Sequence, residues 1–263
     1  MNIGIYTRRK DDSTMRSVRQ LSAIMRQHGI TPIDIEGRIP DGKLDFLLSV
    51  GGDGTLLSVL PIVSDTGIPI VGINFGHLGF LTTAGRDDME TLVANLAEGR
   101  YTIEQRTLLD ITYGNRHTIA LNEVVLHRAI TAEMARTGVY VGDEQVGTYA
   151  GNGVIVATPT GSTAYSLSCG GPILTPDCGC FVITPIAAHT LTLRPLIVPD
   201  NTTIRLTTDP EHQQMHLSID SRQETIAGGE QIAIHRANFA INLVRLKEQT
   251  FLTAIRQKLN WGR

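Results

Sequence analysis

The run Gly51-Gly52-Asp53-Gly54-Thr55 has the clearest capacity for chemistry, and it directly follows the apolar segment 45–50. Glycines let backbone N–H groups approach an anion closely, and a strand that turns into a helix presents such groups to a phosphate. A carboxylate is unfavourable beside phosphates unless it binds a metal or takes up a proton. The run therefore predicts a phosphate-binding turn with a chemically active aspartate, against the alternative of an ordinary glycine-rich turn.

The segment 72–81 (GINFGHLGFL) has a similar arrangement, because glycines again follow an apolar run. Ligands of α/β proteins usually bind in the loops at the carboxyl ends of parallel strands. For His77 alone, a partly exposed loop histidine is the favoured interpretation. We expect the phosphate loop to comprise Gly51, Gly52, Gly54, Thr55, Asn74 and Gly76.

Two further polar groups lie in the second half of the chain. Asn122-Glu123 interrupts an apolar run, so this pair either faces water or recognises hydroxyl and amino groups, such as those of a ribose or a base edge. The run 158–168 (TPTGSTAYSLS) is dense in hydroxyl groups and small residues, and the ring of Tyr165 could stack on a flat ligand. Threonine-rich turns are also common, so this run alone is suggestive.

The elements that must position these residues differ between the two halves. In the first hundred residues, strand patterns at 2–6, 45–50 and 68–73 alternate with helix patterns after 12–14, after the GGDG turn and at 87–98. We expect Asp12, Ser13 or Thr14 to cap the first helix, and Pro61 to interfere with the second. This alternation predicts a parallel sheet with helices on both faces.

After Arg100, the sequence is typical of β structure. Strands are expected at 117–126, 138–142, 153–158, 180–186, 202–208 and 215–220. Near the end, apolar residues at 251, 252, 255 and 259 predict an amphipathic helix. We therefore expect an α/β nucleotide-binding domain over 1–100, an all-β domain over 101–236, and a return of 237–263 to the first domain.

Composition narrows the classes of function. The chain has 263 residues, 41% of them hydrophobic, which excludes wholesale disorder; its formal charge is −3, which argues against nucleic acid as a partner. Its three cysteines lie within 169–180, unlike a secreted disulfide framework or a usual zinc spacing. No run is long and apolar enough for a membrane span, and the N-terminus lacks the pattern of a signal peptide. We expect a cytoplasmic protein.

Together, these motifs resemble those of the NAD kinase family, in the expected order. They are GGDGT at 51–55, NxGxLGFL at 74–81, NE at 122–123, TPTGSTAYS at 158–166 and GGP at 170–172, and the segment 183–196 is similar as well. GGDGT is shared with diacylglycerol and sphingosine kinases and with phosphofructokinases, whereas TPTGSTAY is highly specific.

The resemblance implies a phosphofructokinase- or diacylglycerol-kinase-like α/β domain and a mainly β, sandwich-like domain. It also implies phosphoryl transfer from ATP, or polyphosphate in some members, to the 2′-hydroxyl of the adenosine ribose of NAD. Mg²⁺ is expected to accompany ATP, with no metal site built from protein side chains, and the assembly to be a homodimer or homotetramer.

The resemblance also assigns roles to positions of this chain. Asp53 matches the proton acceptor, and Asn122 with Glu123 matches the pair that binds adenine and ribose groups. The NAD-binding positions implied are Asp53, Gly54, Asn122, Glu123, Asn152, Thr163, Ala164, Tyr165, Ser166, Leu167, Ser168 and Ala187.

The chain departs from the family pattern at several positions. Asn152 stands where an aspartate is usual, Ala150 where an arginine is usual, and Glu133 near a position that is often basic. Asp220-Ser221-Arg222 replaces the common D-G-Q, so that Arg222 could supply a cation. Two other functions stay open on the sequence alone: a lipid kinase that shares the GGDGT turn, and a non-catalytic NAD-binding protein.

Overall fold

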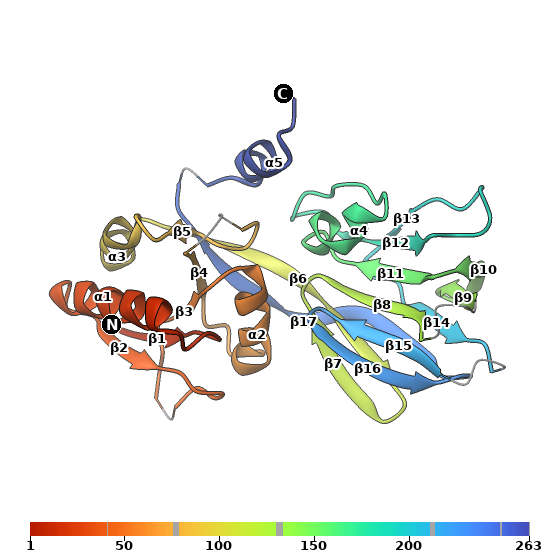
Figure 1. Ribbon diagram of the computed structural model, residues 1–263, viewed down its shortest axis with the longest axis horizontal. Helices are drawn as coiled ribbons and strands as arrows, with labels where there is room; N and C mark the ends of the chain where they lie inside the picture. Colours follow the sequence, from red (N-terminus) through yellow and green to blue (C-terminus); the bar gives the residue numbers. More distant parts are fainter. Residues whose placement is uncertain (41, 76–78, 130–133, 211–213, 248, 263) are drawn as a thin grey trace. The chain divides into compact units, whose positions relative to one another are not determined.

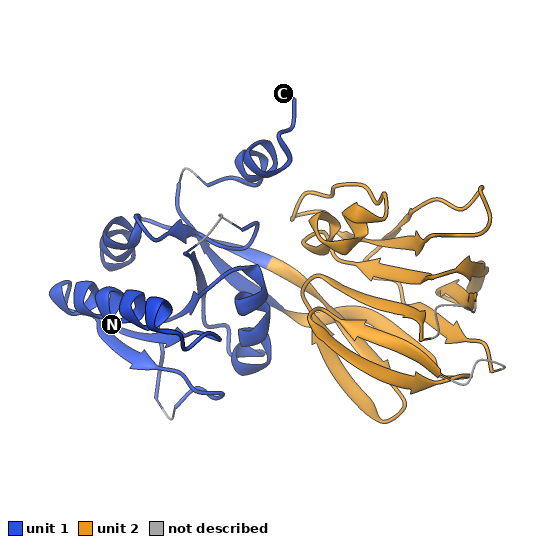
Figure 2. Cartoon of the chain, in the orientation of Figure 1, with its two compact units in different colours: residues 1–105, 240–263 blue, residues 106–239 orange. Residues whose placement is uncertain are grey.

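Two long strands, β6 (Thr102–Tyr113) and β17 (Gln231–Arg245), each run from one structural unit into the other (Figures 1 and 2). The computed structural model describes residues 1–40, 42–75, 79–129, 134–210, 214–247 and 249–262. Unit 1 comprises residues 1–105 and 240–263, and unit 2 comprises residues 106–239. The chain thus enters unit 2 once and returns to complete unit 1.

Unit 1 is built on a parallel sheet with the strand order β17-β4-β3-β1-β2. All five residues of β3 are buried, as expected for a central parallel strand covered on both faces. Its elements are β1 (Asn2–Tyr6), α1 (Asp12–Gln27), β2 (Thr31–Asp34), β3 (Phe46–Val50), α2 (Asp53–Val63), β4 (Ile70–Asn74), β5 (Ala84–Gly85), α3 (Met89–Ala97) and α5 (Phe251–Leu259).

Two details of the helices correct the sequence expectations. The N-cap of α1 is Asp11, whose carboxylate accepts a hydrogen bond from the Thr14 backbone N–H at 2.9 Å, rather than a residue at 12–14. Helix α2 continues through Pro61 and ends only at Val63, because a proline so close to the C-terminus removes a single intrahelical bond. The short strand β2 was not expected from the sequence.

The core of unit 1 lies between the sheet and the neighbouring helices α1 and α3. It takes Leu21 and Met25 from α1, Leu92 and Leu96 from α3, and Val244 from the returning strand β17. The returning segment therefore belongs to the hydrophobic core of the first unit.

Unit 2 contains two antiparallel sheets that both contribute to its main hydrophobic core, and a smaller cluster around Leu174 packs on the second sheet. One has the order β10-β9-β14-β17, with the β6–β7 hairpin attached, and the other has the order β13-β12-β11-β8-β15-β16. Its further elements are β7 (Arg116–Ala120), β8 (Glu123–Arg128), β9 (Ala135–Val141), β10 (Glu144–Gly151), β11 (Gly153–Ala157), a 3-10 turn η1 (Gly161–Thr163), α4 (Tyr165–Ser168), β12 (Cys180–Ile186), β13 (Leu196–Pro199), β14 (Ile204–Thr208), β15 (Gln214–Ile219) and β16 (Arg222–Ala227).

The core of unit 2 draws on both sheets, for example Val139 and Leu206 from one and Leu126 and Phe181 from the other. An α/β unit and a mainly β unit are thus confirmed. The strand expected over 117–126 is two strands, β7 in one sheet and β8 in the other. They separate at Leu121-Asn122 because backbone N–H groups there donate to the Asp220 carboxylate instead of a neighbouring strand.

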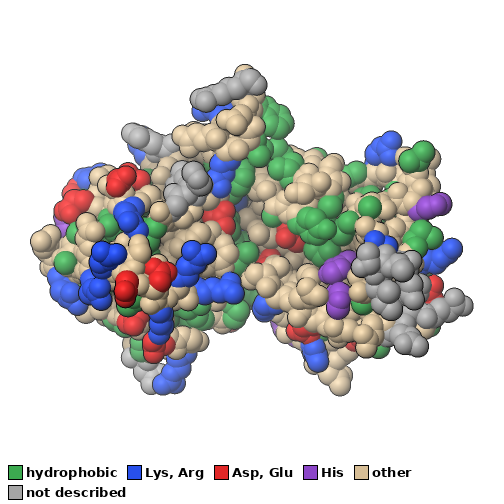
Figure 3. Space-filling view, viewed as in Figure 1, with side chains coloured by type: hydrophobic (Ala, Val, Ile, Leu, Met, Phe, Trp, Pro, Cys, Tyr) green, Lys and Arg blue, Asp and Glu red, His purple; other side chains and the backbone are tan. Residues whose placement is uncertain are grey.

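The surface and the cysteines are unremarkable in the described part of the chain. On the face of unit 1 that Figure 3 shows, basic and acidic side chains are interspersed. Cys169, Cys178 and Cys180 are free thiols of intermediate burial. Among the described helices, none has the length and apolar character that crossing a membrane would require.

Candidate active site

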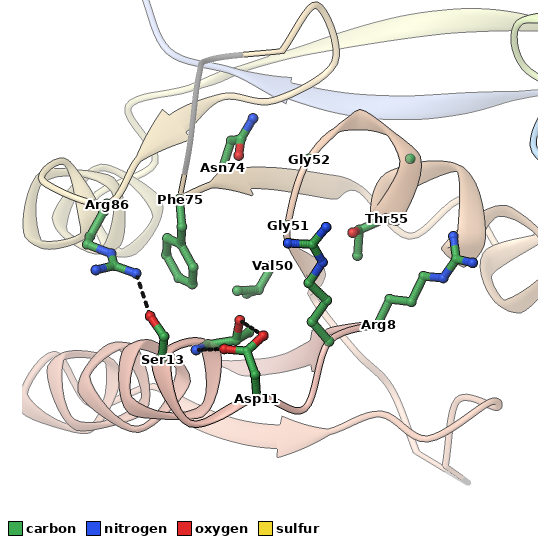
Figure 4. Close-up of a pocket in the computed structure, with 13 residues that line it drawn as sticks. Arg8, Asp11, Ser13, Val50, Gly51, Gly52, Thr55, Asn74, Phe75 and Arg86 are labelled. Atoms are coloured by element: carbon green, nitrogen blue, oxygen red, sulfur yellow. Dashed lines mark hydrogen bonds between the residues drawn. The ribbon is translucent and has the colours of Figure 1, made fainter.

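The GGDG turn joins β3 to α2 and lines a cavity of about 970 Å³ in unit 1 (Figure 4). Gly51 has φ +151° and lies so close to Thr55 that a Cβ would overlap the threonine side chain. Gly52 is the N-cap of α2 and supplies no side-chain hydrogen bond. The Thr55 N–H donates to the Gly52 carbonyl at 2.8 Å, whereas the N–H groups of Asp53 and Gly54 have no acceptor among the described residues and can bind a ligand. The cavity brings together five predicted phosphate-loop residues, Gly51, Gly52, Gly54, Thr55 and Asn74; Gly76 lies outside the described residues, as does His77.

Three arginines that the sequence analysis did not select line the same cavity: Arg8, Arg9 and Arg86. The guanidinium of Arg86 lies 5.0 Å from the centre of the Phe75 ring and donates to Ser13 Oγ at 3.5 Å (Figure 4). Arg8 and Arg9 follow β1, so the rule that ligands bind at the carboxyl ends of parallel strands could have identified them. Together with the helix N-terminus, they suit the cavity to an anion of several charges.

Asp53 is the first residue of α2, and its side chain points to the segment 79–81. Its Oδ2 accepts a hydrogen bond from the Phe80 N–H at 2.8 Å, and its Oδ1 accepts one from the Leu81 N–H at 3.2 Å. A Cβ at Gly79 would overlap this carboxylate. Because Gly79 has no side chain, the backbone of the segment 79–81 can lie against Asp53. The segment thereby fixes the orientation of the carboxylate.

The segment 79–82 is itself held from two sides. The Gly79 N–H donates to Thr82 Oγ1 at 2.6 Å, and Arg245, from the returning strand, donates to the Phe80 carbonyl at 2.9 Å. Arg245 is also paired with Glu104 at 2.7 Å. The position of Asp53 therefore depends on residues from both ends of unit 1.

A second cavity, of about 650 Å³, lies in unit 2. It brings together three of the predicted NAD-binding residues, Glu123, Asn152 and Tyr165. The other predicted residues of unit 2 do not line it: Asn122, Thr163, Ala164, Ser166, Leu167, Ser168 and Ala187. Glu133 lies outside the described residues.

Several of those other residues belong to the turn and helix that carry Tyr165. Thr163 to Ser168 span the η1 turn and helix α4, where the Ser166 hydroxyl is buried and lies 2.8 Å from Thr184 Oγ1. Gly161 packs so closely on Asn122 that a Cβ would overlap its backbone. Tyr165 remains 45% exposed, so its ring is available to a ligand.

Glu123 is the most unusual ionisable group of this cavity. It is buried, and its Oε2 has no hydrogen-bond partner among the described residues. Burial, and then the negative charge of nearby Asp220, raises the pKa of Glu123 to about 8. Near neutral pH this carboxyl group can therefore hold a proton and donate a hydrogen bond to a ligand.

Asp220 and two histidines complete the cavity lining on the side of β8 and β15. Asp220 accepts three backbone hydrogen bonds, from the N–H groups of Leu121 (2.9 Å), Asn122 (2.8 Å) and Glu123 (3.2 Å). The rings of His127 and His216 lie 5.3 Å apart, and burial followed by the proximity of His216 lowers the pKa of His127. The alternation of residues along β8 and β15 could have placed both histidines on one face.

Two family models and several relatives match most of this chain. The family model for the ATP-NAD kinase N-terminal domain matches residues 37–101, and that for the C-terminal domain matches residues 121–246. A protein from Flavobacterium psychrophilum named NAD kinase is 42% identical over 228 residues, which cover 84% of this chain and 78% of that protein.

Two solved structures have the same fold. The yeast NADH kinase in complex with NADH superposes with a TM-score of 0.87 at 23% identity, covering 100% of this chain and 88% of that one. An NAD kinase from Archaeoglobus fulgidus in complex with ATP gives a TM-score of 0.85 at 24% identity, covering 99% of each chain.

Proposed function

This chain belongs to the NAD kinase family, and we propose on that premise that it transfers a phosphoryl group from ATP to the 2′-hydroxyl of the adenosine ribose of NAD, which makes NADP. The observation that carries the proposal is the match of both domains to NAD kinases over most of the chain. The two cavities support it, since one suits a polyanion and the other combines a flat ring with polar groups.

In this proposal the unit 1 cavity binds the ATP phosphates. The amides of the GGDG turn and the guanidinium groups of Arg8, Arg9 and Arg86 offset the negative charge. Mg²⁺ would accompany ATP and neutralise its phosphates. The cavity wall can add a ligand to such an ion through the Asn74 amide oxygen, whereas both Asp11 carboxylate oxygens already accept hydrogen bonds from Thr14.

The unit 2 cavity is proposed to bind the dinucleotide. The exposed ring of Tyr165 offers a stacking surface, and Glu123 and Asn152 offer hydrogen bonds to hydroxyl or amide groups. The remaining predicted NAD-binding residues would act through the turn and helix over 161–168 or through the backbone. These contacts would hold the ribose 2′-hydroxyl at the reacting position, so that this hydroxyl is phosphorylated rather than the others of NAD because of its position.

Asp53 is proposed as the proton acceptor. The ribose 2′-oxygen forms a bond to the γ-phosphorus, the bond from that phosphorus to the bridging oxygen breaks, and ADP leaves with the electron pair. The hydroxyl proton passes to the Asp53 carboxylate and then to water. A weak base suffices, because in a loose transition state the nucleophile keeps its proton until late.

The fold detail, the compartment and the assembly are proposed as well. The parallel sheet and GGDG turn of unit 1 are consistent with a phosphofructokinase- or diacylglycerol-kinase-like domain. The free cysteines are typical of a reducing compartment such as the cytoplasm. A homodimer or homotetramer would follow from the family resemblance.

NADP formation from ATP and NAD tests the proposal. We expect Asp53→Asn to lower kcat by about 100-fold or more, within the range of general-base catalysis, with little change in the KM for NAD. Asp65→Asn, which changes an exposed aspartate of the same unit, is the matched control. NAD binding without NADP formation would identify a non-catalytic binding protein, and phosphorylation of diacylglycerol alone would identify a lipid kinase.

A further inference from the structure

The C-terminal helix α5 covers the segment that holds Asp53. A cavity of about 200 Å³ is lined on one side by Gly79, Phe80 and Thr82 and on the other by residues of α5 and the turn before it. Thr250 caps the helix by accepting a hydrogen bond from the Thr253 N–H at 3.1 Å. Unit 1 thus places its last helix beside the segment whose backbone binds the candidate proton acceptor.

One charged side chain of α5 reaches that segment. Lys258 Nζ lies 4.7 Å from the centre of the Phe80 ring, and the backbone N–H of the same Phe80 donates to Asp53. A cation over an aromatic face is attracted by the ring quadrupole, so this contact holds the ammonium group of Lys258 over the Phe80 ring. Phe80 therefore links Lys258 to Asp53 through one residue.

The charge of Lys258 is not neutralised by a direct partner. Among the described residues, no carboxylate lies within ion-pair distance of its ammonium group, although the charge of Asp53 acts on it. Burial of the ammonium group lowers the pKa of Lys258, and the attraction of Asp53 opposes that shift. An unpaired cation near a proton-accepting carboxylate suits an anion that arrives between them.

We propose that Lys258 is a further catalytic residue, whose ammonium group binds the phosphoryl group while it is transferred to the hydroxyl beside Asp53. The inference rests on the function proposed above. In phosphoryl transfer the negative charge is spread over the equatorial oxygens, and a fixed cation stabilises it. Lys258 keeps its proton throughout, and the bonds that form and break are those already described.

Steady-state kinetics of NADP formation by the full chain tests this role. We expect Lys258→Gln to lower kcat by roughly 30- to 100-fold, with a KM for NAD within about threefold of wild type. Lys258→Arg restores the charge and should recover at least a third of the wild-type kcat. Arg256→Gln removes the same charge from an exposed position two residues earlier on α5, and it should leave kcat within twofold.

The outcomes separate this inference from the proposed function. If the wild type makes NADP and Lys258→Gln behaves like Arg256→Gln, the role of Lys258 is wrong while the proposed function stands. A loss that Lys258→Arg does not recover would also overturn it, as would equal losses in Lys258→Gln and Arg256→Gln. If the wild type makes no NADP, the proposed function falls and the inference falls with it.

Discussion

Asp220 Oδ1 accepts the backbone N–H of Asn122 at 2.8 Å, which fastens the turn between β15 and β16 to the start of β8. The same carboxylate accepts from Leu121 and Glu123, and the Asp220 N–H donates back to the Glu123 carbonyl at 3.0 Å. Asp220 has φ +49°, a conformation that aspartate tolerates better than most residues. The residue therefore positions the Asn122-Glu123 pair without having to touch a ligand.

Replacing Asp220 with Asn should raise the KM for NAD by about 10-fold and change kcat less. An amide offers one oxygen in place of two, so at least one of the three N–H groups loses its acceptor, at a cost of about 1–3 kcal/mol. The kinetics of NADP formation measure both constants. Asp143→Asn, in an exposed hairpin, is the control, and an unchanged KM in Asp220→Asn would contradict the positioning role.

Replacing Gly79 with Ala should abolish most turnover. The added methyl group would occupy the place of the Asp53 carboxylate, so the side chain must leave the N–H groups of Phe80 and Leu81. We expect a loss of kcat of about 100-fold, similar to that of Asp53→Asn. Gly179→Ala, whose added Cβ would make only an ordinary van der Waals contact at 3.8 Å with Asp200 Oδ1, is the control. Normal turnover in Gly79→Ala would show that this contact does not orient Asp53.

The stability of the protein should depend on pH through Glu123. Burial raises its pKa from 4.5 to about 8, so the folded state binds this proton more tightly than the unfolded chain does. The stabilisation is complete below pH 4.5 and is lost as the pH rises through about 8, by up to ~1.4 kcal/mol per unit. Urea denaturation at pH 5 to 8.5 should therefore show a steeper loss in wild type than in Glu123→Gln. Exposed Glu144→Gln should retain the wild-type slope.

Replacing Arg86 with Gln should raise the KM for ATP by about 10-fold and leave the KM for NAD unchanged. The guanidinium lines the unit 1 cavity and is fixed over Phe75, so its loss removes one charge-assisted contact to a phosphate, worth about 1.5–3 kcal/mol. Initial rates at varied ATP concentration measure the KM for ATP. Arg19→Gln, at an exposed position of α1, is the control. A rise in the KM for NAD instead would show that ATP does not bind in the unit 1 cavity.

Replacing Asn152 with Asp should lower the KM for NAD several-fold. The backbone of Asn152 is fixed on both sides, since its N–H donates to Ile186 at 2.9 Å and its carbonyl accepts from Arg128 at 3.0 Å. The substitution therefore changes the charge at a constant position in the cavity, and a carboxylate accepts hydrogen bonds more strongly than an amide. Asn115→Asp, in an exposed turn, is the control. An unchanged KM would show that Asn152 makes no contact with the dinucleotide.

The sequence predicted the α/β and mainly β units because periodicity and turns are local properties. The residue pattern also located the run GGDGT at 51–55, of which Gly51, Gly52, Gly54 and Thr55 line one cavity, while the Asp53 carboxylate binds the Phe80 N–H. The helix expected near the end of the chain is α5. These features follow from residues that are close in the chain.

What the sequence could not provide depends on contacts between distant residues. The break between β7 and β8 is caused by Asp220, about a hundred positions away, so the run 117–126 reads as one strand. Arg86 reaches the phosphate cavity only through the fold of unit 1, and Lys258 approaches Asp53 only because the chain returns to that unit. No spacing rule reports such contacts.

The return of the chain to unit 1 has a consequence for synthesis. Val244 is fully buried in the core of unit 1, and its carbonyl accepts a hydrogen bond from Thr83 Oγ1 at 2.6 Å. On the ribosome, the first hundred residues emerge long before this strand does. While the β unit is translated, the hydrophobic core of unit 1 therefore lacks the side chain of Val244. A chain that ends before residue 244 therefore carries every residue that lines the phosphate cavity but lacks a strand of the core beneath that cavity's sheet, so its first unit should be less stable than that of the full chain.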